Sequence, residues 1–435
     1  MQVFNNLLST FKKIEIRLKQ PTPAMPLSVF RLLFGLAMVF STLRFMLLGW
    51  IEDHYIRPKL HFKYWGFEWI EPLSAEGLYA IHILMMIAAL GVAFTSKITY
   101  KISAIILFIT FTYTELIDIS YYLNHYYYVS IVCLLLCFIP APPPLLKKGY
   151  VVPVWVTGIF KLQIAIVYIY AGLAKINYDW LILALPLKIW LPAHDKMPLI
   201  GEVFTWKITP YLFAWLGMLY DCLIVFFLAN KRTRLFAYGV VIVFHTMVGI
   251  LFQIGVFPLV MIAGTLIFFN FEEKSISESS VSAFQHKKIP VFLYVFFVFQ
   301  LLFPWRYLFY KGNLFWTEEG YRYSWRVMLM EKAGTATFYV KDSKTGREGI
   351  VDNSEFLNPH QEKQMAMQPD MILQFAHFLA EYYSQKGVYK PQVRVEAYVT
   401  LNGRPSRLLI DPKIDLTQQK DTFSPKTWIL HDEND

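Results

Sequence analysis

Nine apolar runs, most of them as long as a membrane-crossing helix, occupy the first 310 residues of this 435-residue chain. An α-helix rises about 1.5 Å per residue, so about 20 apolar residues cross the hydrocarbon layer of a bilayer. Hydrophobic residues make up 56% of the chain and charged residues only 17%, which argues against an ordinary soluble protein. The pattern predicts an α-helical polytopic membrane bundle of about nine transmembrane helices. Their expected bounds are residues 28–48, 74–94, 102–117, 126–139, 157–174, 210–228, 235–252, 257–269 and 289–308.

Short basic segments separate the apolar runs and set the expected orientation of the bundle. Lys and Arg concentrate in the cytoplasmic loops of membrane proteins. With a cytoplasmic N-terminus, five basic segments all fall on the cytoplasmic side, and an odd number of spans leaves the C-terminus outside. The net charge of +9 is therefore interpreted as a topology signal, and we expect a lipid bilayer but no nucleic acid as partner. The five segments are FKKIEIRLK, SKITYK, LLKKG, NKRTR and FQHKK.

The sequence changes character after the last apolar run. We expect a basic cytoplasmic lead over residues 1–27, the helical membrane domain over 28–309 and an extracytoplasmic domain over 310–435. Within the last part, TATFYVKDSKTGREGIVD predicts a β-hairpin around Lys-Thr-Gly, and VRVEAYVTLNGRPSRLLID predicts a second around Asn-Gly. PDMILQFAHFLAEYYSQKG between them has helical spacing and ends on glycine. These elements predict a small α+β soluble domain with β-hairpins.

Polar residues that are unusual in a membrane domain fall on its predicted outer side. Lys175 ends the fifth span, where an ammonium is costly unless it is paired, reaches the headgroups or loses its proton. His125, beside Asn124, lies in the outer turn between spans three and four. His245 lies ten residues into span seven, so about 15 Å along that helix.

Each of these residues also has an ordinary structural interpretation. Lys175 can reach the headgroups, His125 can belong to a tyrosine-rich interface, and His245 can form an interhelical hydrogen bond. Their joint position on one side favours a site. There is no His-Glu-x-x-His motif, cysteine pair or acidic cluster with ligand spacing, so we expect no metal. The cysteines are expected to be small buried hydrophobes within spans: Cys133, Cys137 and Cys222.

The chemistry that these residues support is acid–base chemistry on a lipid-soluble aromatic molecule. A pocket at the outer end of a helical bundle, lined by aromatic residues and methionines, suits such a ligand. Desolvation favours the neutral amine of Lys175, which can act as a general base towards a phenol. His125 and Asn124 can then hydrogen-bond the oxygen that becomes an anion. These residues indicate acid–base chemistry of the quinol type, but they do not identify the substrate.

Several motifs resemble the vitamin K-dependent gamma-glutamyl carboxylases, whose membrane module is shared with the horizontally transferred transmembrane (HTTM) domain proteins. The likeness extends from the first span to about residue 416. Its most specific parts are Ala-Gly-x-x-Lys-x-x-x-Asp-Trp and Tyr-Ser-Trp. The motifs are FRLLFG (30–35), NHYYY (124–128), QIAIVYIYAGLAKINYDW (163–180), HTMVGILFQIGVFPLVM, WTEEGYRYSW (316–325) and LLIDPKIDL (408–416).

The resemblance implies a reaction and roles for individual residues. Lys175 matches the family's essential lysine, which deprotonates vitamin K hydroquinone, a reduced naphthoquinone. O2 then converts the quinol to its epoxide, and the strong base so formed removes a γ-proton from a peptide glutamate, which takes up CO2 to give gamma-carboxyglutamate. His125 and Asn124 match the catalytic pair beside the lysine. The residues that the resemblance places near quinol and substrate are His245, Tyr321, Tyr323, Ser324, Trp325, Gln163 and Trp180.

The sequence also departs from the animal members of this family. Ala174 replaces the first of two adjacent lysines, Arg322 replaces a glycine and Arg326 replaces an acid, while no cysteine is available for their disulfide. These changes affect peptide recognition more than quinol chemistry. We therefore keep two alternatives to the carboxylase: a quinol epoxidase without carboxylation, and a non-enzymatic membrane receptor or scaffold. We expect a bacterial inner membrane, or the endoplasmic reticulum if the source is eukaryotic.

Overall fold

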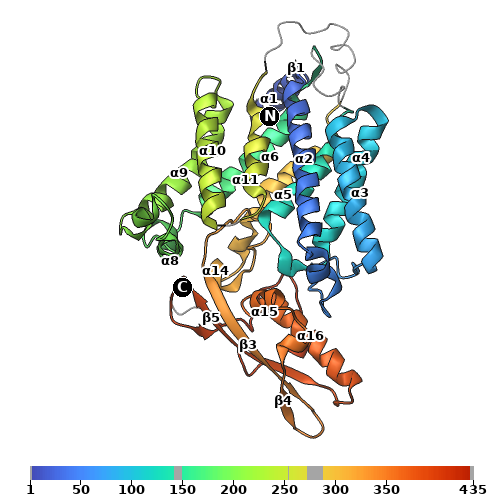
Figure 1. The fold of residues 1–435 in the computed structure, drawn as a ribbon, viewed down its shortest axis with the longest axis vertical. Coiled ribbons are helices and arrows are strands. Elements are labelled where there is room, and N and C mark those ends of the chain that lie inside the picture. Colours follow the sequence, from blue (N-terminus) through green and yellow to red (C-terminus); the bar gives the residue numbers. More distant parts are fainter. Residues whose placement is uncertain (1, 142–148, 253, 272–287, 432–435) are drawn as a thin grey trace.

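A computed structural model describes residues 2–141, 149–252, 254–271 and 288–431 (Figure 1). It contains a helical bundle followed by an α+β region, which confirms the predicted fold class. Each of the nine predicted spans coincides with a helix in the described part of the chain. These helices are α2 (Met25–Leu47), α3 (Ala75–Phe94), α4 (Lys97–Leu116), α5 (Asn124–Phe138), α6 (Val154–Ala174), α9 (Thr209–Ala229), α10 (Arg234–Phe252), α11 (Phe257–Thr265) and α13 (Val291–Leu302).

Six of these helices, counting α13 with the 3-10 turn that continues it, are long and apolar enough to cross a membrane by length and composition. The other three account for the difference from the predicted nine. Helix α4 has 20 residues but is more polar, whereas α5 has 15 residues and α11 only 9. Of the five predicted cytoplasmic segments, LLKKG and FQHKK lie mainly outside the described residues.

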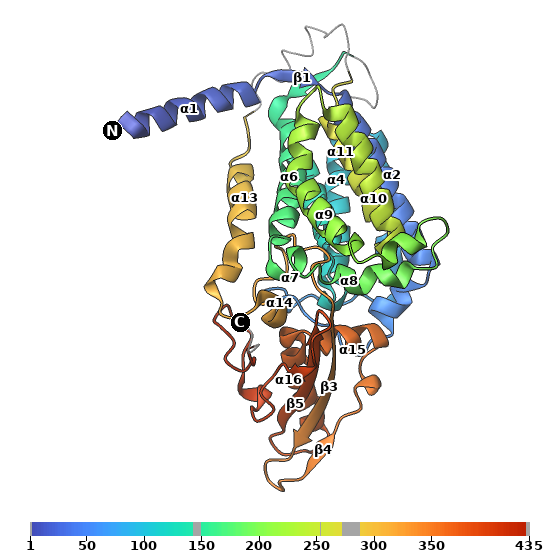
Figure 2. The same cartoon turned by 90° about the vertical axis from the view of Figure 1, so that its left-hand side faces the viewer.

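Short elements cap the two ends of the bundle. At one end, β1 (Pro21–Pro23) pairs antiparallel with β2 (Val151–Pro153), and α1 (Gln2–Leu18) extends sideways from the bundle (Figure 2). At the other end, residues 177–205 form short helices, as expected for a segment too broken to cross. These are α7 (Tyr178–Leu181), α8 (Leu187–Trp190), η3 (Leu191–His194) and η4 (Gly201–Thr205). The remaining short helices are η1 (Glu52–Ile56), η2 (Ile119–Tyr121), η5 (Leu266–Phe268), η6 (Phe303–Phe309), α14 (Leu314–Thr317), η7 (Asn353–Glu355) and η8 (Leu416–Gln418).

The C-terminal region is a four-stranded antiparallel sheet covered by helices, in the order β4-β3-β5-β6. Both predicted hairpins are present, and at the second turn Asn402 and Gly403 have φ of 53° and 74°. The predicted helix ends before Gly387, whose φ of 94° suits glycine. The elements are β3 (Lys332–Lys341), β4 (Glu348–Ile350), α15 (Pro359–Met365), α16 (Pro369–Gln385), β5 (Gln392–Leu401) and β6 (Arg407–Leu408).

Buried polar contacts fix this region against the bundle. The side-chain amide of Gln361, which is fully buried, donates to the Asp118 carboxylate and to the Leu60 carbonyl, each at 2.7 Å. The Arg404 guanidinium donates two hydrogen bonds to the Asp179 carboxylate, at 2.7 and 2.6 Å. Such paired contacts hold the sheet region in one orientation beneath the ends of α4 and α6.

Gln361→Ala should destabilise this docking by about 2–3 kcal/mol, because it leaves a buried carboxyl without one of its donors. Burial raises the pKa of Asp118 to about 6, so in the folded protein this carboxyl takes up a proton sooner than in the unfolded chain as the pH falls. The defect should therefore be smaller at pH 5 than at pH 7.5. Thermal unfolding in detergent measures both effects, with exposed Lys363→Ala as the control. An equal loss at both pH values would contradict this account of Asp118.

Candidate functional site

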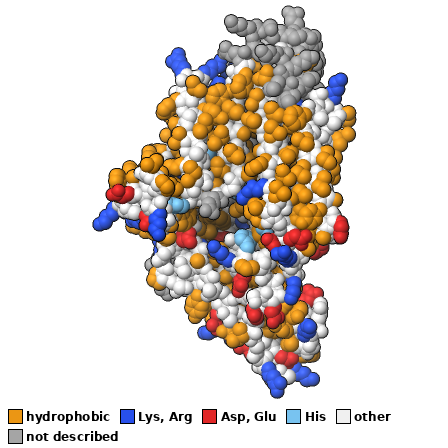
Figure 3. All heavy atoms as spheres, in the orientation of Figure 1, with side chains coloured by type: hydrophobic (Ala, Val, Ile, Leu, Met, Phe, Trp, Pro, Cys, Tyr) orange, Lys and Arg blue, Asp and Glu red, His pale blue; other side chains and the backbone are white. Residues whose placement is uncertain are grey.

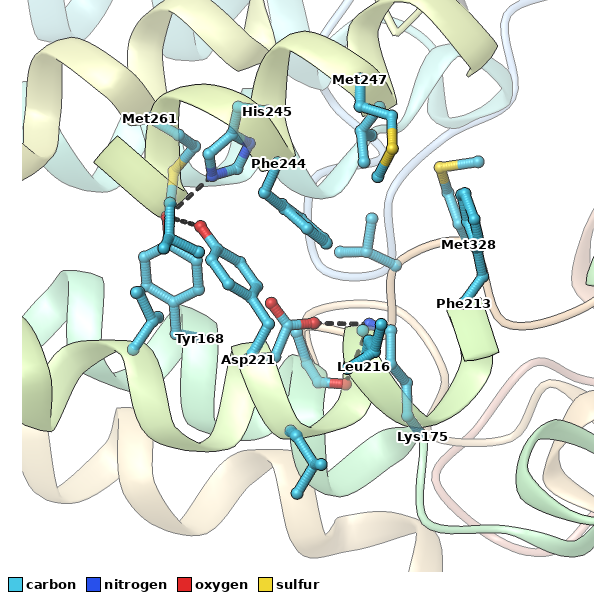
Figure 4. Close-up of a pocket in the computed structure, with 18 of the residues that line it drawn as sticks. Tyr168, Lys175, Phe213, Leu216, Asp221, Phe244, His245, Met247, Met261 and Met328 are labelled. Carbon is cyan, nitrogen blue, oxygen red and sulfur yellow. Dashed lines mark hydrogen bonds and ion pairs between the residues drawn. The ribbon is translucent and has the colours of Figure 1, made fainter. Parts of the chain in front are cut away.

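Lys175 lies directly after α6 and is paired with an aspartate of α9. Its Nζ is 2.7 Å from Oδ2 of Asp221, and the two side chains are only 9% and 7% exposed. The Nζ also donates to the Ala171 carbonyl at 3.3 Å (Figure 4). The two helices approach closely because Gly172 has no side chain: a Cβ there would lie 2.8 Å from the Cys222 backbone nitrogen. The amine is thus buried and paired, and does not extend to the headgroups.

Asp221 was missed by the sequence interpretation, although the sequence contains a signal for it. It is a lone carboxylate inside the predicted apolar span 210–228, in the run GMLYDCLIV. A carboxylate at such a depth is expensive unless it has a partner. The sequence does not show that this partner is Lys175, because 46 residues separate the two positions.

An apolar cavity of about 620 Å³ adjoins this pair. It lies between α6, α9 and α10 and is lined mostly by hydrophobic and aromatic side chains (Figure 4). Trp180 is buried against it, with its indole N–H donating to the Ala214 carbonyl at 2.9 Å and its ring 5.4 Å from the Lys175 ammonium. The labelled residues around the pair are Tyr168, Phe213, Leu216, Phe244, His245, Met247, Met261 and Met328.

His245 lines the same cavity, as expected from its position in the seventh span. Its Nε2 shares a hydrogen bond of 2.7 Å with the Tyr168 hydroxyl, which lies 3.3 Å from the hydroxyl of Tyr220. This is the interhelical hydrogen bond considered above. The other ring nitrogen, Nδ1, is buried and has no partner in the described part of the structure.

His125 and Asn124 line a second, more polar cavity of about 520 Å³. It lies between the outer end of the bundle and the C-terminal region. Four residues line both cavities: Ile254, Phe257, Val327 and Met328. The Phe257 ring is 5.4 Å from that of His125 and 6.0 Å from that of His245. The predicted catalytic residues therefore lie at one end of the bundle, with the lysine on the apolar cavity and the Asn-His pair on the polar one, and these four apolar residues form the wall that the two cavities share.

Asn124 has a second role in this geometry. Its amide donates to the backbone carbonyl of Arg326 at 2.8 Å, and its oxygen accepts from the Tyr122 hydroxyl at 3.1 Å. The side chain thus holds the segment after the Tyr-Arg-Tyr-Ser-Trp motif. The motif and this segment together contain three non-glycine residues with positive φ, a conformation that costs energy and is concentrated at functional sites. They are Tyr323 at 59°, Trp325 at 58° and Met328 at 51°.

The motif itself contributes to the two cavities unequally. Tyr321 lines the polar cavity, whereas Trp325 is fully buried and stacks on Tyr127 at 4.9 Å. Ser324 accepts a hydrogen bond of 2.9 Å from Arg306. Tyr323 lines a smaller cavity of about 330 Å³ beside α4, α5 and α13. Ser324 and Trp325 therefore pack the segment in place and contact neither of the two larger cavities.

Gln163 is a predicted site residue that the structure places inside the helical core. It is fully buried within α6, and it lines neither cavity. Neither atom of its side-chain amide has a hydrogen-bond partner in the described structure. No group of three or more potential metal ligands occurs in the described residues.

Two protein-family models match the chain in the order of its two structural parts. The HTTM domain matches residues 19–272, and the lumenal domain of vitamin K-dependent gamma-carboxylase matches residues 285–435. The chain belongs to the vitamin K-dependent gamma-carboxylase family. It is thus a multi-pass membrane protein with a lumenal C-terminal domain, and its family indicates a carboxylase-type enzyme with vitamin K-dependent chemistry. No solved structure matches the chain.

The buried ion pair of Lys175 and Asp221 should contribute to stability whether or not the protein is an enzyme. Asp221→Leu should destabilise the protein by about 3–5 kcal/mol, because it leaves the Lys175 charge buried without a partner. The double variant Lys175→Met/Asp221→Leu should recover most of that loss, since neither charge remains. Thermal unfolding in detergent measures both. A double variant no more stable than Asp221→Leu would show that the two charges do not depend on each other.

Proposed function

We propose that this protein carries out vitamin K hydroquinone-dependent gamma-carboxylation of a glutamate-containing peptide or protein, coupled to quinol epoxidation by O2. CO2 is the second gaseous co-substrate, and no metal takes part. One observation carries this proposal: a buried amine, Lys175, adjoins an apolar cavity that shares a wall with a polar cavity beneath the lumenal domain. The first cavity suits a flat apolar quinol, and the second suits a charged peptide side chain.

The pair of Lys175 and Asp221 supplies a base that is suited to a phenol. Transfer of the proton from the Lys175 ammonium to the Asp221 carboxylate leaves two neutral groups, an amine and a carboxylic acid. The free amine can then accept the proton of a quinol hydroxyl. His245 lines the same cavity, where it can contact the quinol ring. The quinol supplies, on reaction with O2, the strong base that the next step requires.

The second step explains why a lysine alone is insufficient. A γ C–H bond of glutamate is a far weaker acid than an ammonium, and each unit of pKa mismatch costs about 1.4 kcal/mol. The strong base must therefore arise from oxygen chemistry in a place that excludes water. We assign His125, whose ring lies 5.4 Å from that of Phe257, to a hydrogen bond with a quinol oxygen that reaches into the polar cavity, and Asn124 to positioning of the segment around Arg326.

The proposal includes an orientation of the protein in the membrane. The basic N-terminal segment and the β1–β2 pair lie at the end of the bundle opposite the lumenal domain (Figure 2). We place the N-terminus in the cytoplasm and the C-terminal domain outside, in a bacterial inner membrane, or in the lumen if the source is eukaryotic.

Lys175→Arg should abolish epoxide formation, because a guanidinium stays protonated and cannot act as a base. The measurement is chromatographic detection of vitamin K epoxide from purified protein supplied with reduced quinone, O2 and bicarbonate. Exposed Lys188→Arg, on nearby α8, serves as the matched control and should retain turnover. Substantial epoxide from the Lys175→Arg protein would remove the lysine from this role.

The quinol epoxidase without carboxylation remains the second candidate, because the apolar cavity with its lysine is sufficient for quinol oxidation. The same reaction with labelled bicarbonate and a glutamate peptide separates the two. Label recovered as gamma-carboxyglutamate establishes the carboxylase, whereas epoxide without label establishes the epoxidase. If neither product forms, the receptor or scaffold interpretation holds.

His125→Ala should slow epoxide formation by about 10²-fold, the usual loss when one donor to a developing anion is removed. The rate should fall without a change in thermal unfolding, since no hydrogen bond of His125 within the described structure is lost. A rate close to that of the unsubstituted protein would assign His125 to packing against Phe257.

A further inference from the structure

The polar cavity has an excess of positive charge. Four cationic side chains line it, but only one carboxylate does. In Figure 3 the surface is hollowed between the apolar helical part and the lumenal domain, and basic and acidic side chains gather around the hollow. The cations are Arg44, Arg322, Arg326 and Lys332, and the carboxylate is Glu318.

Two of these cations are already neutralised. Lys332 is paired with Glu318 at 2.8 Å, with side chains 2% and 11% exposed. Arg322 pairs with Asp370 and also donates to the Gln368 side chain. Burial alone lowers the pKa of Arg322, but the Asp370 carboxylate outweighs burial and the net shift is upward. These two ion pairs belong to the lining of the polar cavity, and neither leaves an uncompensated charge for a ligand.

The other two cations have no acidic partner among the described residues. The Arg326 guanidinium lies over the Tyr307 ring at 4.5 Å, and its Nε is buried without a hydrogen bond. The Arg44 guanidinium lies over the Trp50 ring at 4.8 Å. An aromatic face stabilises a guanidinium only partly, so each retains N–H donors that a ligand in the cavity can use.

We propose that Arg326, assisted by Arg44, binds the side-chain carboxylate of the glutamate that is to be modified. This inference rests on the proposed function and adds the residues that select the substrate. A guanidinium binds a carboxylate through two parallel N–H···O hydrogen bonds, which fix both position and orientation. Asn124 sets the backbone of Arg326 through its 2.8 Å hydrogen bond, so Asn124 acts here as a positioning residue.

The position of Arg326 in the polar cavity places a bound carboxylate next to the apolar cavity. A carboxylate held at Arg326 leaves the carbon next to it free to approach the residues shared with the apolar cavity, Val327 and Met328. These follow Arg326 directly in the sequence. The side chain of the substrate would therefore enter from the lumenal side, while the quinol occupies the opposite side of the wall.

The test measures binding of two blocked pentapeptides, Ala-Ala-Glu-Ala-Ala and Ala-Ala-Gln-Ala-Ala, to the full-length protein in detergent without quinol. The unsubstituted protein should bind the glutamyl peptide at least about 10-fold more tightly, the discrimination expected from one charged hydrogen-bonded pair. Arg326→Gln should bind both peptides equally. Arg347→Gln, at an exposed position before β4, is the matched control and should keep the preference.

Arg326→Lys is the second variant, in case Arg326→Gln does not fold. It should keep the preference for the glutamyl peptide but weaken it several-fold, because an ammonium cannot form the two parallel hydrogen bonds. Free glutarate as competitor distinguishes the source of the carboxylate: weak competition identifies a peptide site, and competition stronger than the peptide itself would overturn the assignment to a protein substrate.

Equal binding of the two peptides by the unsubstituted protein, or an unchanged preference in Arg326→Gln, would overturn the proposal. These results are distinct from failure of the proposed function, because they require no turnover. A protein that prefers the glutamyl peptide but incorporates no labelled CO2 retains the Arg326 site and loses only the carboxylase assignment.

Discussion

The ion pair between Lys175 and Asp221 is the constraint on which the rest of the site depends. Two charges at the end of a helical bundle are tolerated only if they face each other, and this requires α6 and α9 to be in close contact. Gly172 allows that contact, and Trp180 covers the pair from the outer side. The apolar cavity beside the pair follows from the same arrangement, since its walls are the faces of α9 and α10 that turn towards Lys175.

Much of the fold followed from the sequence because its signals are local. Apolar length located the nine helices, and turn residues such as Asn402 and Gly403 located the hairpins. The side on which Lys175, His125 and His245 lie followed from alternation of the spans. The expected run over residues 126–139 agrees with α5, whereas the run expected over 257–269 divides into α11 and the 3-10 turn η5.

The details of the site depended on contacts between distant parts of the chain, and these were less predictable. Asp221 is 46 residues from its partner, and Asn124 is 202 residues from the carbonyl of Arg326 that it binds. Trp325, which the resemblance places near the substrate, is fully buried with its ring stacked on that of Tyr127. A motif identifies a segment, whereas the direction of each side chain is set by backbone conformation, here by positive φ at Tyr323 and Trp325.

The wall between the two cavities has a further consequence. The side chains of Ile254, Phe257, Val327 and Met328 carry no hydroxyl, amide or charge, so these four side chains offer no readily exchangeable hydrogen to either cavity. A reactive base formed beside them therefore meets only C–H bonds on these side chains. A polar residue introduced at Met328 would supply an acidic hydrogen that protonates this base. Oxidation of the quinol would then be uncoupled from modification of the peptide. The apolar character of these four side chains thus favours coupling of quinol oxidation to modification of the peptide.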